Sequence, residues 1–577
     1  MSVELKSQLC ELLRDALANA APDQQVDSIT LERPKQASHG DFATNLALQL
    51  AKQLKLNPRD IANRLVAELP RSSLLIKAEV AGAGFINLFL APAAKLQVVG
   101  SVFTQGERYG RSTAGQNRKV QVEYVSANPT GPLHVGHGRG AAYGASLASL
   151  LDFAGYQVTR EYYVNDAGRQ MDILALSVWL RYLELHGSAL PFPKNAYQGD
   201  YVRDMAAGIK RAHDTAFARD AAAVAANAPD AEADAEGHLD ALIANAKALL
   251  GDDYAYVHSY ALNEQLGDCR EDLAEFGVHF ENWFSEKSLF DTGLVARAVG
   301  LLEKKGHIYE QDGARWFRST TFGDEKDRVV QRENGLYTYF ASDIAYHLNK
   351  YERGYDLIIN IWGADHHGYI PRVKGALQAL GLDPAKLDVA LVQFAVLYRD
   401  GQKTSMSTRS GEFVTLRELR REVGNDACRF FYVLRKSDQH LDFDLDLAKS
   451  QSNENPVYYI QYAHARVCSV LAQWDGDEPT LVGAALSPLC NERELALCAR
   501  LAEFPEVIDN AARDYAPHAI AFYLKDLASD FHSYYNAERI LVDDEPLRLA
   551  RLALCAATRQ VLRNGLAILG VAAPSSM

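Results

Sequence analysis

The chain has 577 residues, too many for one hydrophobic core, which indicates three or more domains. A hydrophobic content of 48% and a charged content of 23% are typical of a soluble globular protein and exclude a disordered one. The formal net charge of −14 weighs mildly against nucleic-acid binding, although phosphate contacts need only a local basic face. No apolar run is long enough to span a bilayer, so we expect no membrane partner. Seven scattered cysteines without a C-x-x-C pair predict a cytoplasmic protein without a structural zinc site.

The first part of the chain, residues 1–110, predicts a small accessory α+β domain. Residues 1–20 have the pattern of one amphipathic helix. Residues 38–69 predict two helices, broken where Pro58 follows Asn57. Residues 76–90 predict a strand, a glycine turn and a second strand.

Residues 111–450 alternate β-rich runs with helical patterns, which predicts a multidomain α/β chain with a Rossmann-type parallel sheet at its centre. The strands are expected at residues 119–126, 158–165, 355–365 and 388–398. An Ala-rich, acidic segment at about residues 190–255 predicts inserted surface helices, and its composition argues against chemistry there. Residues 451–577 contain only helical patterns and predict an all-α bundle.

The run GPLHVGHGRG, residues 131–140, follows a predicted strand and begins a predicted helix. A strand, a tight turn and a helix N-terminus form the arrangement with which α/β proteins bind phosphate. His134 and His137 are three residues apart, so they share one face of the first helical turn and can donate to phosphate oxygens. Gly136 leaves room for a nucleotide to approach the backbone. These residues predict a nucleoside triphosphate site.

The sequence VEYVSANPTGPLHVGHGRG around these histidines resembles that of arginyl-tRNA synthetases, and HVGH resembles the HIGH motif of class I synthetases. The resemblance covers nearly the whole chain. It implies an arginine–tRNA ligase that uses L-arginine, ATP and tRNA(Arg), with activation that generally requires bound tRNA. It also implies a tRNA-elbow-binding N-terminal domain and an anticodon-binding C-terminal bundle. A monomer is the default expectation.

The resemblance places the KMSKS loop of class I synthetases at residues 401–413. The matching pentapeptide, residues 405–409, has serine and threonine where the motif has its two lysines. We therefore expect Lys403 or Arg409 to supply the charge that neutralises phosphate. A solvated basic surface loop is the alternative. The ATP contacts implied in this loop are Met406 and Ser407.

An arginine pocket needs carboxylates, because the guanidinium is a permanently charged fork of donors that is costly to bury unpaired. Glu123 lies inside the first predicted strand, where a charge is unexpected, and Asp343 lies four residues after Tyr339 on one helix face. The resemblance implies that Glu123 and Asp343 receive the guanidinium and that Tyr339 lines the pocket. It also implies that Ser126 and Asn128 hold the α-amino and carboxylate groups.

The run IWGADHHGYIPR, residues 361–372, follows a strand and therefore lies at the carboxyl edge of the sheet, where ligands bind in such folds. Gly363 permits close approach of ATP and Asp365 can accept from ribose hydroxyls. The resemblance places a His or Gln toward the substrate at 366 or 367, and we assign His367. A metal site at these side chains is the less favoured alternative; Mg²⁺ carried by the ATP phosphates needs no protein cage.

Tyr459 and Arg466 are seven residues apart on one face of a predicted helix, and the resemblance places anticodon contacts there. An aromatic ring and a guanidinium suit unstacked RNA bases. The alternative is that the tyrosine ring packs against the helix bundle and the arginine side chain is solvated, as is usual on an amphipathic helix. Two rival functions stay open: an adenylate-forming enzyme for a different acid, and a catalytically silent RNA-binding homologue.

Overall fold

The computed structural model describes residues 3–34, 36–404 and 414–577. The chain forms two compact units. One unit is Gly115–Ser450, and the other combines Met1–Ala114 with Gln451–Met577.

The centre of the Gly115–Ser450 unit is a five-stranded sheet whose neighbouring strands are all parallel. Its order is β11-β10-β4-β5-β6, with β4 (Lys119–Glu123) in the middle. The other strands are β5 (Gln157–Val164), β6 (Asn282–Ser285), β10 (Leu357–Gly363) and β11 (Leu387–Val392). This order confirms the predicted Rossmann-type sheet. From β4 the chain adds β5 and β6 on one side of the sheet, and it later adds β10 and β11 on the other side. In such sheets, ligands bind at the carboxyl ends of the two strands where the strand order changes side, here β4 and β10.

The single strand expected at residues 388–398 is wrong. The chain leaves the sheet after Val392, and β12 (Ala395–Arg399) joins a second sheet with β13 (Gln402–Lys403) and β14 (Leu441–Asp444). Between them, the Gln393 amide donates to the carbonyl of Ser437, and the Gln393 carbonyl accepts from the buried Arg139 guanidinium at 2.8 Å. At Gln393 these hydrogen bonds replace the pairing with β10. The sequence is hydrophobic on both sides of Gln393, so it gave no sign that the strand ends there.

Helix α5 (Val135–Phe153) packs against β4, β5 and β10. Gly144 of this helix lies against the Tyr124 ring, where a side chain would clash. Helices α12 (Leu294–Lys304), α13 (Tyr339–Glu352) and α14 (Ile370–Leu380) share another core with a small antiparallel sheet. Its strands are β7 (Ile308–Gln311), β8 (Ala314–Phe317) and β9 (Arg328–Gln331). Short helices complete the unit: α11 (Lys287–Asp291), α15 (Leu416–Val423), α16 (Asn425–Val433) and α17 (Leu445–Lys449).

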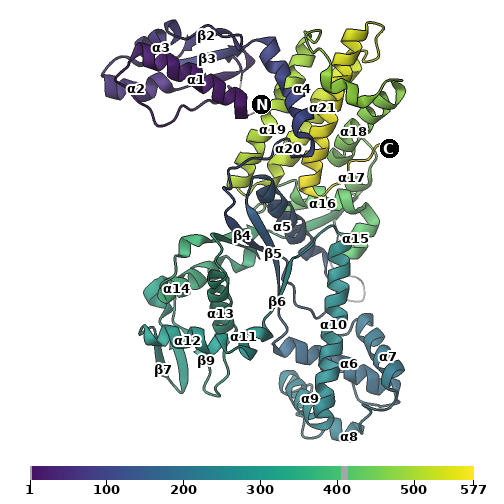
Figure 1. Ribbon diagram of the computed structural model, residues 1–577. Coiled ribbons are helices and arrows are strands. Elements are labelled where there is room, and N and C mark those ends of the chain that lie inside the picture. Colours follow the sequence, from purple (N-terminus) through teal and green to yellow (C-terminus); the bar gives the residue numbers. More distant parts are fainter. Residues whose placement is uncertain (1–2, 35, 405–413) are drawn as a thin grey trace. The chain divides into compact units, whose positions relative to one another are not determined.

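A helical module is inserted between β5 and β6 (Figure 1). It comprises α6 (Arg169–Leu185), α7 (Asp200–His213), α8 (Ala221–Val224), α9 (Ala235–Leu250) and α10 (Asp252–Glu275). The expected surface helices therefore exist, but they enclose a hydrophobic core of their own with α6 and α10. The buried Trp179 belongs to this core, and its indole N–H donates to the carbonyl of Phe217 at 2.9 Å.

The other unit contains the predicted α+β and all-α parts. Its α+β part has an antiparallel sheet with the order β1 (Phe42–Thr44), β3 (Phe85–Leu90) and β2 (Leu75–Ala81). Four helices accompany this sheet: α1 (Val3–Ala20), α2 (Leu46–Leu54), α3 (Pro58–Ala67) and α4 (Pro92–Gln105). The predicted break holds, since the Asn57 side chain caps α3 by accepting from the Arg59 amide at 2.9 Å. The three-residue β1 was not predicted. The bundle comprises α18 (Pro456–Gln473), α19 (Glu492–Arg513), α20 (Pro517–Ala537) and α21 (Glu545–Leu569).

Candidate active site

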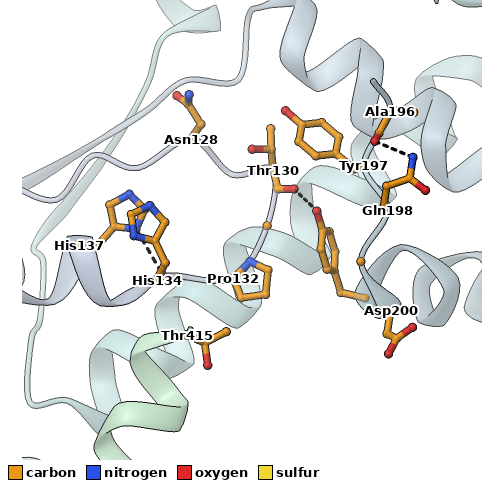
Figure 2. Close-up of a pocket in the computed structure, with 13 residues that line it drawn as sticks. Asn128, Thr130, Pro132, His134, His137, Ala196, Tyr197, Gln198, Asp200 and Thr415 are labelled. Carbon is orange, nitrogen blue, oxygen red and sulfur yellow. Dashed lines mark hydrogen bonds between the residues drawn. The ribbon is translucent and has the colours of Figure 1, made fainter. Parts of the chain in front are cut away.

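His134 and His137 form the N-terminal cap of α5 (Figure 2). Nδ1 of His134 accepts from the Gly136 amide at 3.1 Å, and Nδ1 of His137 accepts from the His134 amide at 3.3 Å. The rings stack with 3.7 Å between centroids, on one face as their spacing predicts. A Cβ at Gly136 would lie 2.8 Å from the His134 ring, so glycine allows this ring to fold back over the helix start.

The two imidazoles are neutral donors. Burial lowers the pKa of His134, and burial together with the neighbouring His134 lowers the pKa of His137 to about 3. Because both Nδ1 atoms accept backbone hydrogen bonds, each Nε2 carries the remaining proton. Two N–H donors at a helix N-terminus suit phosphate oxygens, since the helix dipole adds its own favourable potential.

A cavity of about 650 Å³ lies beside the histidines. Its wall includes Asn128, Thr130 and Thr415, and it is closed on another side by residues 196–201 of the inserted module (Figure 2). The Tyr201 hydroxyl donates to the carbonyl of Thr130 at 2.7 Å. A short segment of the insertion therefore lines this cavity. The prediction that the insertion carries no chemistry stays a prediction.

The backbone after β4 is strained. Val125 and Ser126 have φ values of 66° and 44°, a left-handed conformation that is rare for any residue with a Cβ and rarest for a β-branched one. This turn brings the Ser126 hydroxyl back to Glu123, where it donates to Oε1 at 3.1 Å, and it accepts from the Tyr163 amide at 3.1 Å. Asn128 is held by hydrogen bonds from Asn165 and to Gln170.

Three carboxylates converge beside this turn. Glu123 is buried on the central strand, and its Oε2 accepts from Lys350 Nζ at 2.5 Å. Asp343, on the same face of α13 as Tyr339, accepts from the Tyr369 hydroxyl. The third, Glu286, was not predicted. It is 2% exposed, its carboxylate accepts from the Ser342 hydroxyl at 2.8 Å, and it interacts with the Tyr163 hydroxyl. Its place directly after β6, at the carboxyl edge, was the available signal.

The electrostatics of this cluster favour a cation. Burial raises the pKa of Asp343 to about 7, with Glu286 and Glu123 adding to the rise and with Tyr369 and Lys350 opposing it. Burial also raises the pKa of Glu286. The pKa of Tyr163 is raised by burial and by Glu286, Asp343 and Glu123, so all three carboxylates face this one ring. A bound cation would relieve this crowding of negative charge.

The remaining predicted positions are less enclosed. Tyr339 is 55% exposed at the start of α13. Gly363 ends β10, and exposed Asp365 and His367 follow in a 3-10 turn. Lys403 is exposed at the end of β13.

Met406, Ser407 and Arg409 lie outside the described residues. Within the described ranges no group of three His, Cys, Asp or Glu residues is placed to hold a metal ion. No helix in this part of the chain is both long and apolar enough to cross a membrane.

Tyr459 and Arg466 lie on α18. The Arg466 guanidinium lies 4.5 Å from the Tyr462 ring centroid and 4.9 Å from that of Tyr535. The ring of Tyr459 lies 4.5 Å from that of His532. These half-buried rings and one guanidinium form an aromatic surface on the bundle.

Three family models match the chain. The Arginyl tRNA synthetase N terminal domain matches residues 7–90, and the DALR anticodon binding domain matches residues 460–577. The catalytic domain of tRNA synthetases class I (R) matches residues 98–189 and 273–440, on either side of most of the inserted module.

Close relatives match from end to end. The arginine–tRNA ligases of Azoarcus sp. (strain BH72) and Aromatoleum aromaticum are 74% and 72% identical over 588 residues, covering 100% of each chain. A putative arginyl-tRNA synthetase structure from Campylobacter jejuni is 31% identical with a TM-score of 0.75, covering 85% of this chain and 100% of its own. The Thermus thermophilus arginyl-tRNA synthetase structure, at 24% identity and a TM-score of 0.71, covers 99% and 100% and supports the fold.

Proposed function

The chain belongs to the arginyl-tRNA synthetase family, the class I arginine–tRNA ligases, and we propose that its acidic cluster binds the substrate arginine beside an ATP site at the start of α5. The arginine carboxylate attacks the α-phosphorus of ATP, and the bond to pyrophosphate breaks. A terminal ribose hydroxyl of tRNA then attacks the arginyl carbonyl, and AMP leaves. The observation that carries this proposal is the convergence of Glu123, Asp343 and Glu286 on Tyr163, in the unit whose helix α5 begins with two neutral histidine donors.

The guanidinium binds among the three carboxylates. Among the residues that the structure describes, neither Asp343 nor Glu286 forms an ion pair with a basic side chain, and Glu123 faces the same Tyr163 ring. Tyr339 covers the mouth of the pocket, while Ser126 and Asn128 hold the α-amino and carboxylate groups. Burying a guanidinium here gives the crowded anions a counter-charge, which explains a preference for arginine over neutral side chains.

The triphosphate binds at the N-terminus of α5. The Nε2–H groups of His134 and His137 donate to phosphate oxygens, and Gly136 allows close approach. The opposite side is closed by Lys403 or Arg409, with Met406 and Ser407 of the same loop. Gly363 and Asp365 receive the adenosine, and His367 faces the substrate. ATP enters with Mg²⁺ on its phosphates, an arrangement that needs no protein cage for the metal.

The RNA contacts lie outside this pocket. We assign residues 1–110 to the tRNA elbow and the α18 surface, with Tyr459 and Arg466, to the anticodon, where the rings can stack on unpaired bases. Residues 111–450 supply the chemistry. Activation requires bound tRNA, and the enzyme works in the cytoplasm as a monomer.

Exchange of labelled pyrophosphate into ATP tests the proposal. With tRNA present, exchange should be fastest with arginine and much slower with lysine or glutamine. Substituting His137→Ala should abolish most of the exchange. A catalytically silent RNA-binding homologue would show no exchange even before the substitution. Lys403→Ala should lower turnover far more than ATP affinity. If pyrophosphate exchange is unchanged in this variant, Arg409 is the residue that neutralises the phosphate charge. A crystal soaked with arginine and a non-hydrolysable ATP analogue tests all the pocket assignments together.

A further inference from the structure

Lys350 is a lysine without solvent contact that lies behind Glu123 of the proposed arginine pocket. It lies on α13 with a relative exposure of 0%, two turns after Asp343 on the same helix face. Burying an ammonium costs several kcal/mol unless its partners compensate, so its placement next to an arginine pocket calls for an explanation.

Two hydrogen bonds and one aromatic ring surround the ammonium group of Lys350. Nζ donates to Glu123 Oε2 at 2.5 Å and to Asn360 Oδ1 at 2.7 Å, and it lies 4.3 Å from the centroid of the Tyr346 ring. The Asn360 amide in turn reaches Nε2 of His347 at 2.8 Å, and Nδ1 of His347 donates to the Asp343 carbonyl at 2.8 Å. The network therefore connects β4, β10 and two turns of α13.

Glu123 is the member of this network that reaches the substrate pocket. One oxygen is tied to Lys350, and the other, Oε1, accepts from Ser126 at the strained turn after β4. Lys350 thus fixes the rotamer of Glu123, while its own charge stays behind the carboxylate. Without Lys350, Glu123 would be a buried carboxyl group with no cationic partner, and such a group takes up a proton near neutral pH.

We propose that Lys350 is a positioning residue for arginine binding, which holds Glu123 in place as an ionised carboxylate before the substrate enters. This inference rests on the proposed role of Glu123 in the arginine pocket. It predicts that arginine binds without first removing a proton from Glu123, and that this advantage disappears when the lysine charge is removed.

Titratable groups face Glu123 from two neighbouring elements. Asp343 and Tyr346 face it from α13, and Tyr163 faces it from β5. Glu161, the register partner of Glu123 on β5, is paired with Arg353 and is the same in every variant compared. The pKa values of both tyrosines are raised by burial, so they stay neutral over the range tested. Asp343, with its pKa of about 7, titrates as well, and Lys350 lowers that pKa, so removing the lysine also shifts the titration of Asp343. The Glu123→Gln/Lys350→Met variant retains Asp343, and any recovery of its arginine affinity with pH therefore measures the contribution of Asp343.

The test is the dissociation constant of arginine, measured by calorimetry on the full chain and expressed relative to wild type at the same pH. At about pH 7, Lys350→Met should weaken binding at least about tenfold, because Glu123 must lose a proton as arginine binds. At about pH 8.5 most of this loss should disappear, since Glu123 is then ionised in the free protein. Glu123→Gln/Lys350→Met, which has no titrating group at this position, should bind weakly at both pH values.

Three outcomes decide the matter. Wild-type affinity in Lys350→Met at pH 7, or a loss that is equal at both pH values, would overturn the inference, because a packing defect does not respond to pH. Wild-type affinity in Glu123→Gln alone would instead refute the role of Glu123 in the pocket. If Lys350→Met does not fold, Lys350→Gln keeps a donor without the charge and should show the same recovery with pH.

Discussion

The raised pKa of Asp343 makes arginine binding depend on pH in a way that can be calculated. A guanidinium needs the ionised carboxylate. With a pKa of about 7, Asp343 is ionised in only about half of the molecules at neutral pH. The apparent affinity scales with the ionised fraction, so it should fall about twofold at pH 7 and about elevenfold at pH 6 relative to full ionisation. Between pH 8 and pH 6 the loss is about tenfold, or about 1.4 kcal/mol.

Asp343→Asn should weaken arginine binding and reduce its dependence on pH. At an effective dielectric constant near 20, a guanidinium about 4 Å from a carboxylate gains about 4 kcal/mol. Glu286 and an amide hydrogen bond retain part of this, so we expect a loss of at least about a hundredfold, or about 2.7 kcal/mol. Calorimetric titration of arginine into the wild-type and variant chains at three pH values measures both effects.

A thermal melt supplies the control. Because the folded-state pKa of Asp343 is raised above its unfolded value, its contribution to stability is present at low pH and is lost as pH rises through about 7. Asp343→Asn should therefore raise Tm, and by more at pH 8 than at pH 6. Arginine affinity in the wild-type chain that is unchanged between pH 8 and pH 6 would refute the reasoning, as would an Asp343→Asn variant that keeps the pH dependence.

Three further predictions concern the site and its support. His137→Ala should slow arginine-dependent pyrophosphate exchange at least about a hundredfold while leaving arginine affinity unchanged in calorimetry. Val125→Gly should relieve about 1 kcal/mol of backbone strain in urea denaturation, yet raise the arginine KM because Ser126 is held less firmly. Arg139→Met should cost at least about 3 kcal/mol in the same denaturation assay, since the buried guanidinium donates to three backbone carbonyls; a smaller loss would mean that water replaces it.

The parallel sheet was predictable because its longer strands are continuous hydrophobic runs, and their alternation with helices leaves few alternatives. The four-residue β6 was not, because its side chains are only half buried and its sequence, NWFS, has no strand periodicity. Missing β6 also hid Glu286, whose significance depends on the edge at which that strand ends.

The histidine pair was predictable for a related reason. Its geometry is local, and a three-residue spacing at a helix start determines it. The pairing of Glu123 with Lys350 joins residues 227 positions apart, and segment 196–201 reaches the cavity through the tertiary packing of the inserted module. Neither contact has any signature in the local sequence.

The histidines at the proposed nucleotide end and Asp343 at the proposed arginine end respond differently to pH. Burial lowers the pKa of both rings, which favours their neutral form as the pH falls. Asp343, with its pKa of about 7, gains a proton over the same range. At the proposed site, acidification should therefore weaken arginine binding before it affects the nucleotide end.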